Sequence, residues 1–348
     1  MIDFTSMQKT KKTYSGANGA KIGVLYQEEK YMLKFPGTAK FNKEMSYANG
    51  CVSEYIGCHI FEIIGIPVQK TILGTYLKGE KEKLVVACKD FTDKYTVLQD
   101  FASVKNTIVD SLSGGYDTTL FDVINTIEEQ SFISSEKLKE WFWDMFIVDA
   151  LIGNWDRHNG NWGFLYNAEK DQVEIAPIYD CGSCLYPQAD EKLMKEILED
   201  RDAMMYRVFE IPLSALKEDG KKINYYDFIS SLKNEDCNRA LERIIPKIDM
   251  EKINCMIDEI PYLSDISKIF YKTILEERKK IILDKSLEKL ESENKSLQEY
   301  LEENFQEYEE EFSMIIRDAR DYMREHKVSA CDAVEEVMEN NYVKSKSR

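Results

Sequence analysis

An acidic and an amide residue on one short polar loop are the residues of this sequence best suited to chemistry. The loop runs from Gly153 to Asn161, between a strongly apolar segment and a strand-like run. Such a loop exposes many backbone polar groups, so it is expected at a functional surface. In phosphoryl transfer a carboxylate faces the attacking hydroxyl, and an oxygen ligand holds magnesium on the phosphates. Asp156 is therefore the expected catalytic residue, and Asn161 an expected metal ligand.

A second polar loop, residues 177–183, supplies another carboxylate, Asp180. It follows two strand-like runs, residues 162–166 and 172–176, which predict a hairpin. A strand, a turn and a returning strand bring Asp180 back beside Asn161, so that both oxygen ligands would meet at one Mg²⁺ on the β- and γ-phosphates. Either loop alone is a weak signal. Their order on a helix–loop–hairpin–loop frame favours a functional site.

The elements that must position these loops can be read from periodicity. A helix is expected over residues 137–152, capped by Ser134 or Ser135, because its apolar residues recur at helical spacing. Residues 162–166 and 172–176 would extend from the far end of the catalytic loop. The first loop thus follows a buried helix directly and precedes a strand.

The N-terminal zone contains most of the other strand-like runs. Residues 21–26 and 31–35 predict a hairpin across a polar turn, with Tyr31, Leu33 and Phe35 on one face and Met32 and Lys34 on the other. A helix is expected over residues 47–64, closed by Gly65 and Pro67. Strands are expected at residues 69–76 and 83–87. The segment 86–90, including Cys88, is the expected interlobe hinge, where adenine would bond to the backbone.

Composition limits the compartment and the partners. The chain has 348 residues, a net charge of −17 and eight cysteines. This charge disfavours nucleic acid and anionic membranes as partners. Residues 1–12 lack the apolar core of a signal peptide, and no run is long enough to span a membrane. A cytoplasmic protein with reduced thiols is expected, and Cys181 and Cys184 are interpreted as core residues despite their C-x-x-C spacing.

The two loops together resemble the HipA-like serine/threonine kinases. The motif Gly-Asn-x-Asp-Arg-His-x-x-Asn, followed by Tyr-Asp-x-Gly-Ser, carries this resemblance, which extends over most of residues 13–285. The short N-terminus is similar to the compact members of the family. The resemblance implies an α+β, two-lobed protein-kinase-like fold. We assign residues 1–92 to the N-lobe, 93–285 to the C-lobe and 286–348 to an acidic helical extension without a counterpart in the family, expected as an amphipathic helix docked on the C-lobe.

The resemblance also implies roles for residues outside the two loops. Lys34 would contact the α- and β-phosphates of ATP, and Glu54 would hold Lys34 in place. From the residues alone, an inward lysine on a strand also fits a snorkelling edge residue. His158 fits two interpretations equally: a contact to phosphate, or a pin that holds the loop through backbone hydrogen bonds.

The glycine-rich segment 15–23 does not match the G-x-G-x-x-G pattern. Its place before the first hairpin nevertheless favours a flexible lid over the phosphates. Ser15, Gly16 and Gly19 are its candidate nucleotide-binding residues. HipA-like kinases are autophosphorylated on a serine in this region, which implies Ser15 as the first candidate here and Thr13 as the second. Two added negative charges at this place would oppose ATP binding.

The function expected from these features is an ATP- and Mg²⁺-dependent serine/threonine protein kinase that acts on a protein substrate. The resemblance also allows the toxin of a toxin–antitoxin pair, with an antitoxin protein as partner. Two alternatives stay open. A lipid or small-molecule kinase would share the Asp-Arg-His-x-x-Asn and Asp-x-Gly motifs, although the acidic charge disfavours it. A nucleotide-binding pseudokinase would keep the fold without turnover.

Overall fold

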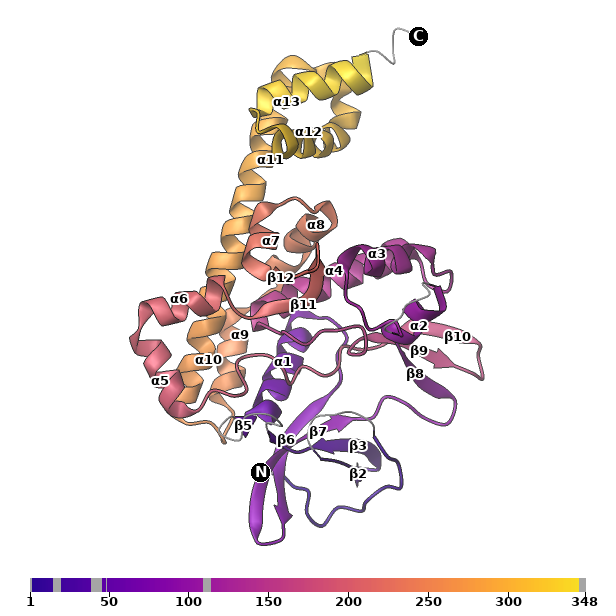
Figure 1. The fold of residues 1–348 in the computed structure, drawn as a ribbon, viewed down its shortest axis with the longest axis vertical. Helices are drawn as coiled ribbons and strands as arrows, with labels where there is room; N and C mark the ends of the chain where they lie inside the picture. Colours follow the sequence, from indigo (N-terminus) through magenta and orange to yellow (C-terminus); the bar gives the residue numbers. More distant parts are fainter. Residues whose placement is uncertain (1, 15–19, 39–45, 48, 109–113, 344–348) are drawn as a thin grey trace.

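The chain folds into two lobes and a helical module at its C-terminus (Figure 1). The computed structural model describes residues 2–14, 20–38, 46–47, 49–108 and 114–343. The fold is the α+β, two-lobed arrangement that the sequence predicts, with a small β-rich lobe below a larger, mainly helical one. No helix of the described residues is both long enough and apolar enough to cross a membrane.

The N-lobe is built on a five-stranded sheet in the order β1-β6-β7-β3-β2. The strands are β1 (Ile2–Asp3), β2 (Lys21–Tyr26), β3 (Glu29–Lys34), β6 (Thr71–Lys78) and β7 (Lys81–Lys89), and a small pair, β4 (Gly37–Thr38) and β5 (Ser46–Tyr47), lies apart from them. Only two residues, at positive φ, separate β2 from β3, and this tight turn fixes the register of the hairpin.

The expected alternation along β3 is confirmed, since Tyr31, Leu33 and Phe35 are buried in one cluster. That cluster lies on one face of the sheet, so Lys34 is left on the other face, toward α1 (Gly50–Ile64). The helix starts three residues later than expected because Ser46–Tyr47 forms β5 instead. It ends as expected at Gly65, whose φ of 87° is a conformation that glycine adopts without strain.

The C-lobe is organised around α4 (Ser135–Ile152), the helix expected from the apolar pattern. The Ser134 side chain accepts a hydrogen bond from the Lys137 N–H and caps it, as one of the two predicted caps. Beyond the catalytic loop, β9 (Gly163–Asn167) and β10 (Gln172–Ile175) form the expected hairpin. A further strand that was not predicted from the sequence, β8 (Thr96–Asp100), pairs with β9 and completes a three-stranded sheet.

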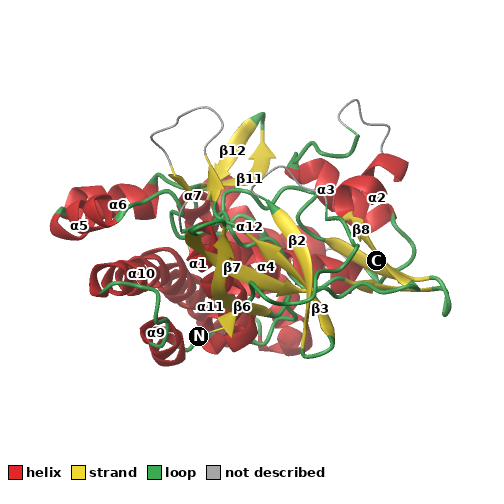
Figure 2. Cartoon of the chain, turned by 90° about the horizontal axis from the view of Figure 1, so that it is seen from below, coloured by secondary structure: helices red, strands yellow, loops and turns green. Residues whose placement is uncertain are grey.

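Helices and one short hairpin make up the rest of the C-lobe (Figure 2). The remaining elements of this lobe are α2 (Phe101–Ile108), α3 (Leu120–Glu129), α5 (Glu191–Glu199), α6 (Arg201–Phe209), β11 (Leu213–Glu218), β12 (Lys221–Asn224), α7 (Tyr225–Ser231), α8 (Glu235–Ile244), the 3₁₀ turn η1 (Ile245–Lys247), α9 (Met250–Asp258) and α10 (Asp265–Arg278). One continuous apolar core runs from α1 through α4 to these helices.

The C-terminal extension is helical, but the expectation of one docked helix is wrong. A π-helical segment, η2 (Lys279–Asp284), joins α10 to α11 (Lys285–Asn304), and the chain reverses after Phe305. It continues through η3 (Gln306–Glu311), α12 (Phe312–His326), α13 (Ala330–Val337) and η4 (Met338–Val343). Leu297, Leu301 and Ile315 belong to a second apolar core that these helices enclose. The extension is therefore a module with a core of its own (Figure 1).

This separate core predicts a local effect of a core mutation. Ile315 is fully buried in the module, so Ile315→Ala should destabilise it by about 2–4 kcal/mol through lost apolar contacts and a residual cavity. Hydrogen exchange should then accelerate at the amides of α12 and α13 and stay unchanged in α4. The neighbouring residue Met314 is exposed, and Met314→Ala is the control. Equal acceleration in α4 would contradict a separate module.

Candidate active site

A lysine from the N-lobe and a carboxylate from the C-lobe meet between the two lobes. The Lys34 ammonium lies 2.8 Å from Glu54 Oε2 on α1 and 2.8 Å from Asp180 Oδ1 on the second loop. Glu54 is almost fully buried, so it has few other positions open to it. Burial opposes the charge on Lys34, but the charges of Asp180 and Glu54 outweigh it and raise the pKa of Lys34 well above its usual value. Lys34, Glu54 and Asp180, which were expected at the nucleotide and metal sites, thus form one charge network.

Asp180 is held in an unusual backbone conformation at this network. Its φ is 58°, in the left-handed region, which aspartate tolerates better than most non-glycine residues. The Lys34 charge lowers the pKa of the Asp180 carboxyl to about 2, so this group is ionised at neutral pH. The next backbone N–H, at Cys181, donates to Glu54 Oε1 at 3.1 Å. Glu54 therefore fixes both Lys34 and the loop that contains Asp180.

The catalytic loop is pinned from inside by Arg157. Its guanidinium forms a buried ion pair with Asp149 of α4, with Nε 2.9 Å from Oδ2. The same guanidinium donates through Nη1 to the carbonyl oxygens of Asn161 and Tyr179. One buried side chain thus joins the end of the first loop to the residue before Asp180. The role of Arg157 is to hold the two loops together.

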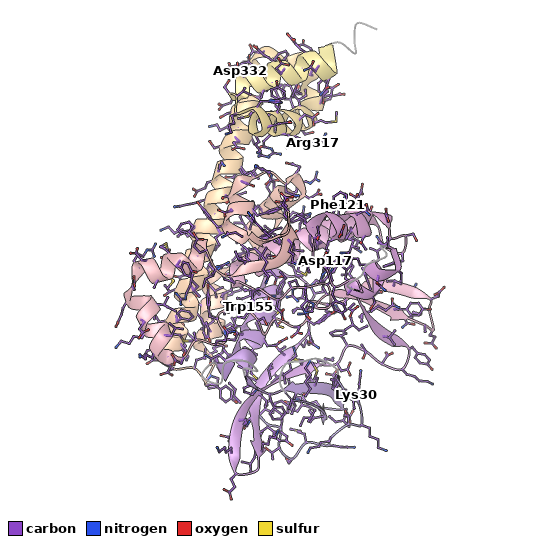
Figure 3. All side chains as sticks on the ribbon, in the orientation of Figure 1. Lys30, Asp117, Phe121, Trp155, Arg317 and Asp332 are labelled. Atoms are coloured by element: carbon purple, nitrogen blue, oxygen red, sulfur yellow. The ribbon has the colours of Figure 1, made fainter. Side chains whose placement is uncertain are left out.

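Asp156 and Asn161 both belong to this loop. The label of Trp155 in Figure 3 shows where the loop lies, between the small sheet and the large lobe. The Asn161 amide N–H donates to the Asp156 carbonyl at 2.7 Å, so the amide oxygen is the atom suited to a metal. Burial raises the pKa of the Asp156 carboxyl, and the charge of Asp180 raises it further. The charge of Asp180 thus acts on the Asp156 carboxyl.

His158 holds the loop with one ring nitrogen and faces Asp156 with the other. The Gly160 N–H donates to His158 Nδ1 at 3.0 Å, and Nε2 lies 4.0 Å from Asp156 Oδ1. The loop-pinning interpretation of this residue therefore has a contact to support it, while its proposed phosphate contact stays a prediction. The Ser183 hydroxyl, which the sequence analysis did not single out, lies 3.4 Å from Asp156 Oδ2.

A second lysine, not predicted from the sequence, lies beside the charge network. Lys21 on β2 stands opposite Lys34 in the hairpin register. Burial lowers the pKa of Lys21 and so does the charge of Lys34, whereas Asp180 and Glu54 act in the opposite direction. The charges of Lys34, Asp180 and Glu54 thus also act on Lys21. The register of the predicted hairpin could have indicated it, because residues opposite each other on paired strands face the same side.

Three further predicted residues, Ser15, Gly16 and Gly19, lie outside the described residues. Immediately before them, Tyr14 and Lys12 both bond to Asp90, at 2.9 and 2.6 Å, and so connect the base of the glycine-rich segment to the expected hinge. Cys88 is fully buried on β7, and burial raises the pKa of its thiol well above the usual value. Cys88 stands opposite Met32 of β3 and Thr71 of β6, so its backbone is part of the sheet, and the expected contact with adenine stays a prediction.

The oxygen atoms at the site fit magnesium held through a nucleotide. Among the described residues, no group of three or more His, Cys, Asp or Glu side chains is arranged to hold a metal ion. Mg²⁺ at nucleotide sites takes one or two protein oxygen ligands and completes its shell with phosphate and water. The Asp180 carboxylate and the Asn161 amide are ligands of this kind.

Comparisons with known proteins agree with this geometry. The HipA-like C-terminal domain matches residues 12–251. The serine/threonine-protein kinase CtkA of Helicobacter pylori is 52% identical over 285 residues, which cover 81% of this chain and 86% of CtkA. The crystal structure of the H. pylori proinflammatory kinase CtkA superposes with a TM-score of 0.78 at 50% identity, over 83% of this chain and 97% of that one.

A more distant solved structure is the HipA, HipB and operator DNA complex of Shewanella oneidensis. It matches with a TM-score of 0.46 at 14% identity and covers 80% of this chain and 68% of the chain compared.

The ion pair between Lys34 and Asp180 predicts how Asp180 titrates. The folded-state pKa of about 2 lies below the ordinary value of 3.8, so ionised Asp180 stabilises the fold above pH 4, and this contribution is lost as the pH falls from about 4 to 2. In Lys34→Met the carboxyl ¹³C shift of Asp180 should titrate at a higher pH than in the wild type. Lys30→Met, an exposed lysine on the same strand, is the control. An unchanged midpoint in Lys34→Met would contradict the network.

Proposed function

The chain belongs to the HipA-like C-terminal domain family, and from this premise we propose that it is a serine/threonine protein kinase. It transfers the γ-phosphoryl group of ATP to a hydroxyl of a protein substrate. The observation that supports this most directly is the ion-paired set Lys34, Glu54 and Asp180, assembled from both lobes beside Asp156. Such a set positions a nucleotide against an acceptor group.

Each residue of the set has a separate task. Lys34, with Lys21 opposite it, holds the nucleotide phosphates by charge. Asn161 and Asp180 hold Mg²⁺, which supplies neutralisation of phosphate charge when it is bound. Asp156 orients the acceptor hydroxyl and accepts its proton, and its raised pKa makes it a better base than an ordinary aspartate. The fixed loop keeps this carboxylate in place without reorganisation.

Regulation and partners follow from the same family. Autophosphorylation at Ser15 or Thr13 would place negative charge beside the nucleotide phosphates and inactivate the enzyme. We propose a cytoplasmic location, where ATP is available and the eight thiols stay reduced. An antitoxin that binds and restrains the kinase is the partner that a toxin role would require.

Removal of either key carboxylate should abolish the reaction. Asp156→Asn and Asp180→Asn each lower kcat by about 10³-fold or more, because one loses the base and the other a metal ligand. The assay is transfer of labelled phosphate from ATP to protein. The control is Asp171→Asn, since Asp171 lies at an exposed turn with a φ of 49°, which asparagine also tolerates. Activity retained in Asp156→Asn would contradict the assignment.

Autophosphorylation is tested by mass spectrometry of the intact protein and its fragments. After incubation with ATP and Mg²⁺, the wild type should gain phosphate at Ser15 or Thr13, and Asp156→Asn should gain none. Ser15→Ala and Thr13→Ala, made separately, identify the acceptor. Phosphate found at neither residue in the wild type would rule out this regulation and leave the kinase assignment standing.

A further inference from the structure

Two segments outside the catalytic loop are bonded to it, and we call them together the rim. One segment is residues 114–119, held by Asn159, whose amide N–H donates to the carbonyl oxygens of Gly115 and Asp117 at 2.9 and 2.7 Å. The other is the hairpin of β11 and β12. The hydroxyl of Tyr225, directly after β12, donates to the Asn154 carbonyl at 2.6 Å. Both segments are thus bonded to the loop that contains Asp156.

The two segments are also bonded to each other. The Thr118 hydroxyl donates to the Ala215 carbonyl at 2.6 Å, and the Lys217 N–H donates to the Thr118 carbonyl at 2.9 Å. Asp117, labelled in Figure 3, lies beside this junction. The rim is therefore fixed relative to Asp156, and charges on it have defined positions near the acceptor hydroxyl.

Two carboxylates, one on the rim and one beside it, have partners within the protein. Asp117 lies 4.0 Å from the Lys217 ammonium. Asp100 accepts hydrogen bonds from the Ser103 N–H and hydroxyl, at 2.8 and 2.5 Å, and from the Tyr116 hydroxyl at 3.5 Å. These carboxylates are thus partly neutralised by groups of the protein itself.

In contrast to these carboxylates, Lys222 on β12 adds a positive charge to the rim. It stands opposite Lys217 in the strand register and is exposed, while its neighbour Ile223 points into the core. Within the described parts of the chain, no carboxylate lies within salt-bridge distance of its ammonium. Lys222 lies three residues before Tyr225, whose hydroxyl bonds to the Asn154 carbonyl two residues before Asp156, so β12 is held beside the acceptor loop.

We propose that Lys222 is a specificity residue that selects protein substrates with an acidic side chain beside the acceptor serine or threonine. This inference rests on the proposed kinase function. The acceptor hydroxyl must come within hydrogen-bond reach of Asp156, so the residues that flank it lie over the rim.

Because the rest of the protein is strongly acidic, the positive charge of Lys222 affects which substrates can approach the site. The chain has a net charge of −17, and Asp156 and Asp180 line the centre of the site. An acidic flanking residue would be repelled by these groups, and Lys222 offsets that repulsion at one position. An exposed ion pair attracts weakly, and reversal of the charge replaces this attraction by repulsion of similar size, so an effect of about tenfold on relative rates is expected.

The test compares peptides that share one acceptor serine and differ only in the flanking residues, which are Glu, Gln or Lys. The wild type should give a kcat/KM about tenfold higher on the Glu peptide than on the Lys peptide, less so at high salt. Lys222→Glu should reverse this order. The control is Lys221→Glu, an adjacent exposed lysine of the same strand, which should keep the wild-type order. Thermal unfolding of both variants confirms that they fold.

Two results would overturn the inference. One is the same order of peptides in the wild type and Lys222→Glu. The other is an equal fall on all peptides with a raised KM for ATP, which would make Lys222 a nucleotide contact. Failure of the kinase proposal looks different, because the wild type would then transfer phosphate neither to any peptide nor to itself, and the inference would fall with it.

Discussion

The buried ion pair between Arg157 and Asp149 is the interaction on which the site depends. Both side chains are almost fully buried, so each has lost its hydration. A buried pair is a weak source of net stability, yet removal of one partner costs about 3–5 kcal/mol because the other charge is left unpaired. Here the guanidinium also donates to the carbonyls of Asn161 and Tyr179. Its contribution is therefore positional, since it sets the distance between the two loops that supply the catalytic and metal-binding oxygens.

A close helix–loop contact transmits this positioning to the N-lobe. Gly57 of α1 packs against the turn after Asp180, and a Cβ at this glycine would lie 2.8 Å from Cys181 Cβ. One helical turn earlier, Glu54 bonds to Lys34 and to the Cys181 N–H. The absence of a side chain at residue 57 thus lets α1 approach closely enough for Glu54 to reach both groups. The cysteines of this loop act as small packing residues, as their free and buried thiols indicate.

Features that depend on residues close together in the sequence could be predicted, whereas features that depend on distant residues could not. Capping, alternation and helical periodicity are local, so the α4 cap and the buried face of β3 were predicted well. The strand β8 has three exposed residues and no apolar alternation, and only its pairing with β9 makes it a strand. Lys21 is indicated only by the register of the predicted hairpin, and Lys222 has no local signal, because its importance comes from charges distant in sequence. The C-terminal module was missed because one apolar repeat fits a single helix and a folded-back bundle equally.

The C-terminal module is fixed to the C-lobe and contains none of the residues assigned to the reaction. Arg320 of α12 is buried, and it donates to Glu235 of α8 at 2.7 Å and to Asn294 of α11 at 2.7 Å. The bond to Glu235 is one connection between the module and the C-lobe, and the continuous helical run from α10 through η2 into α11 is the other. The described residues assigned to nucleotide, metal or acceptor lie between β2 and β12 along the chain, and none of them belongs to α11, α12 or α13. The residues assigned to the reaction thus precede the extension in the chain, and differences in such extensions between relatives need not alter the reaction.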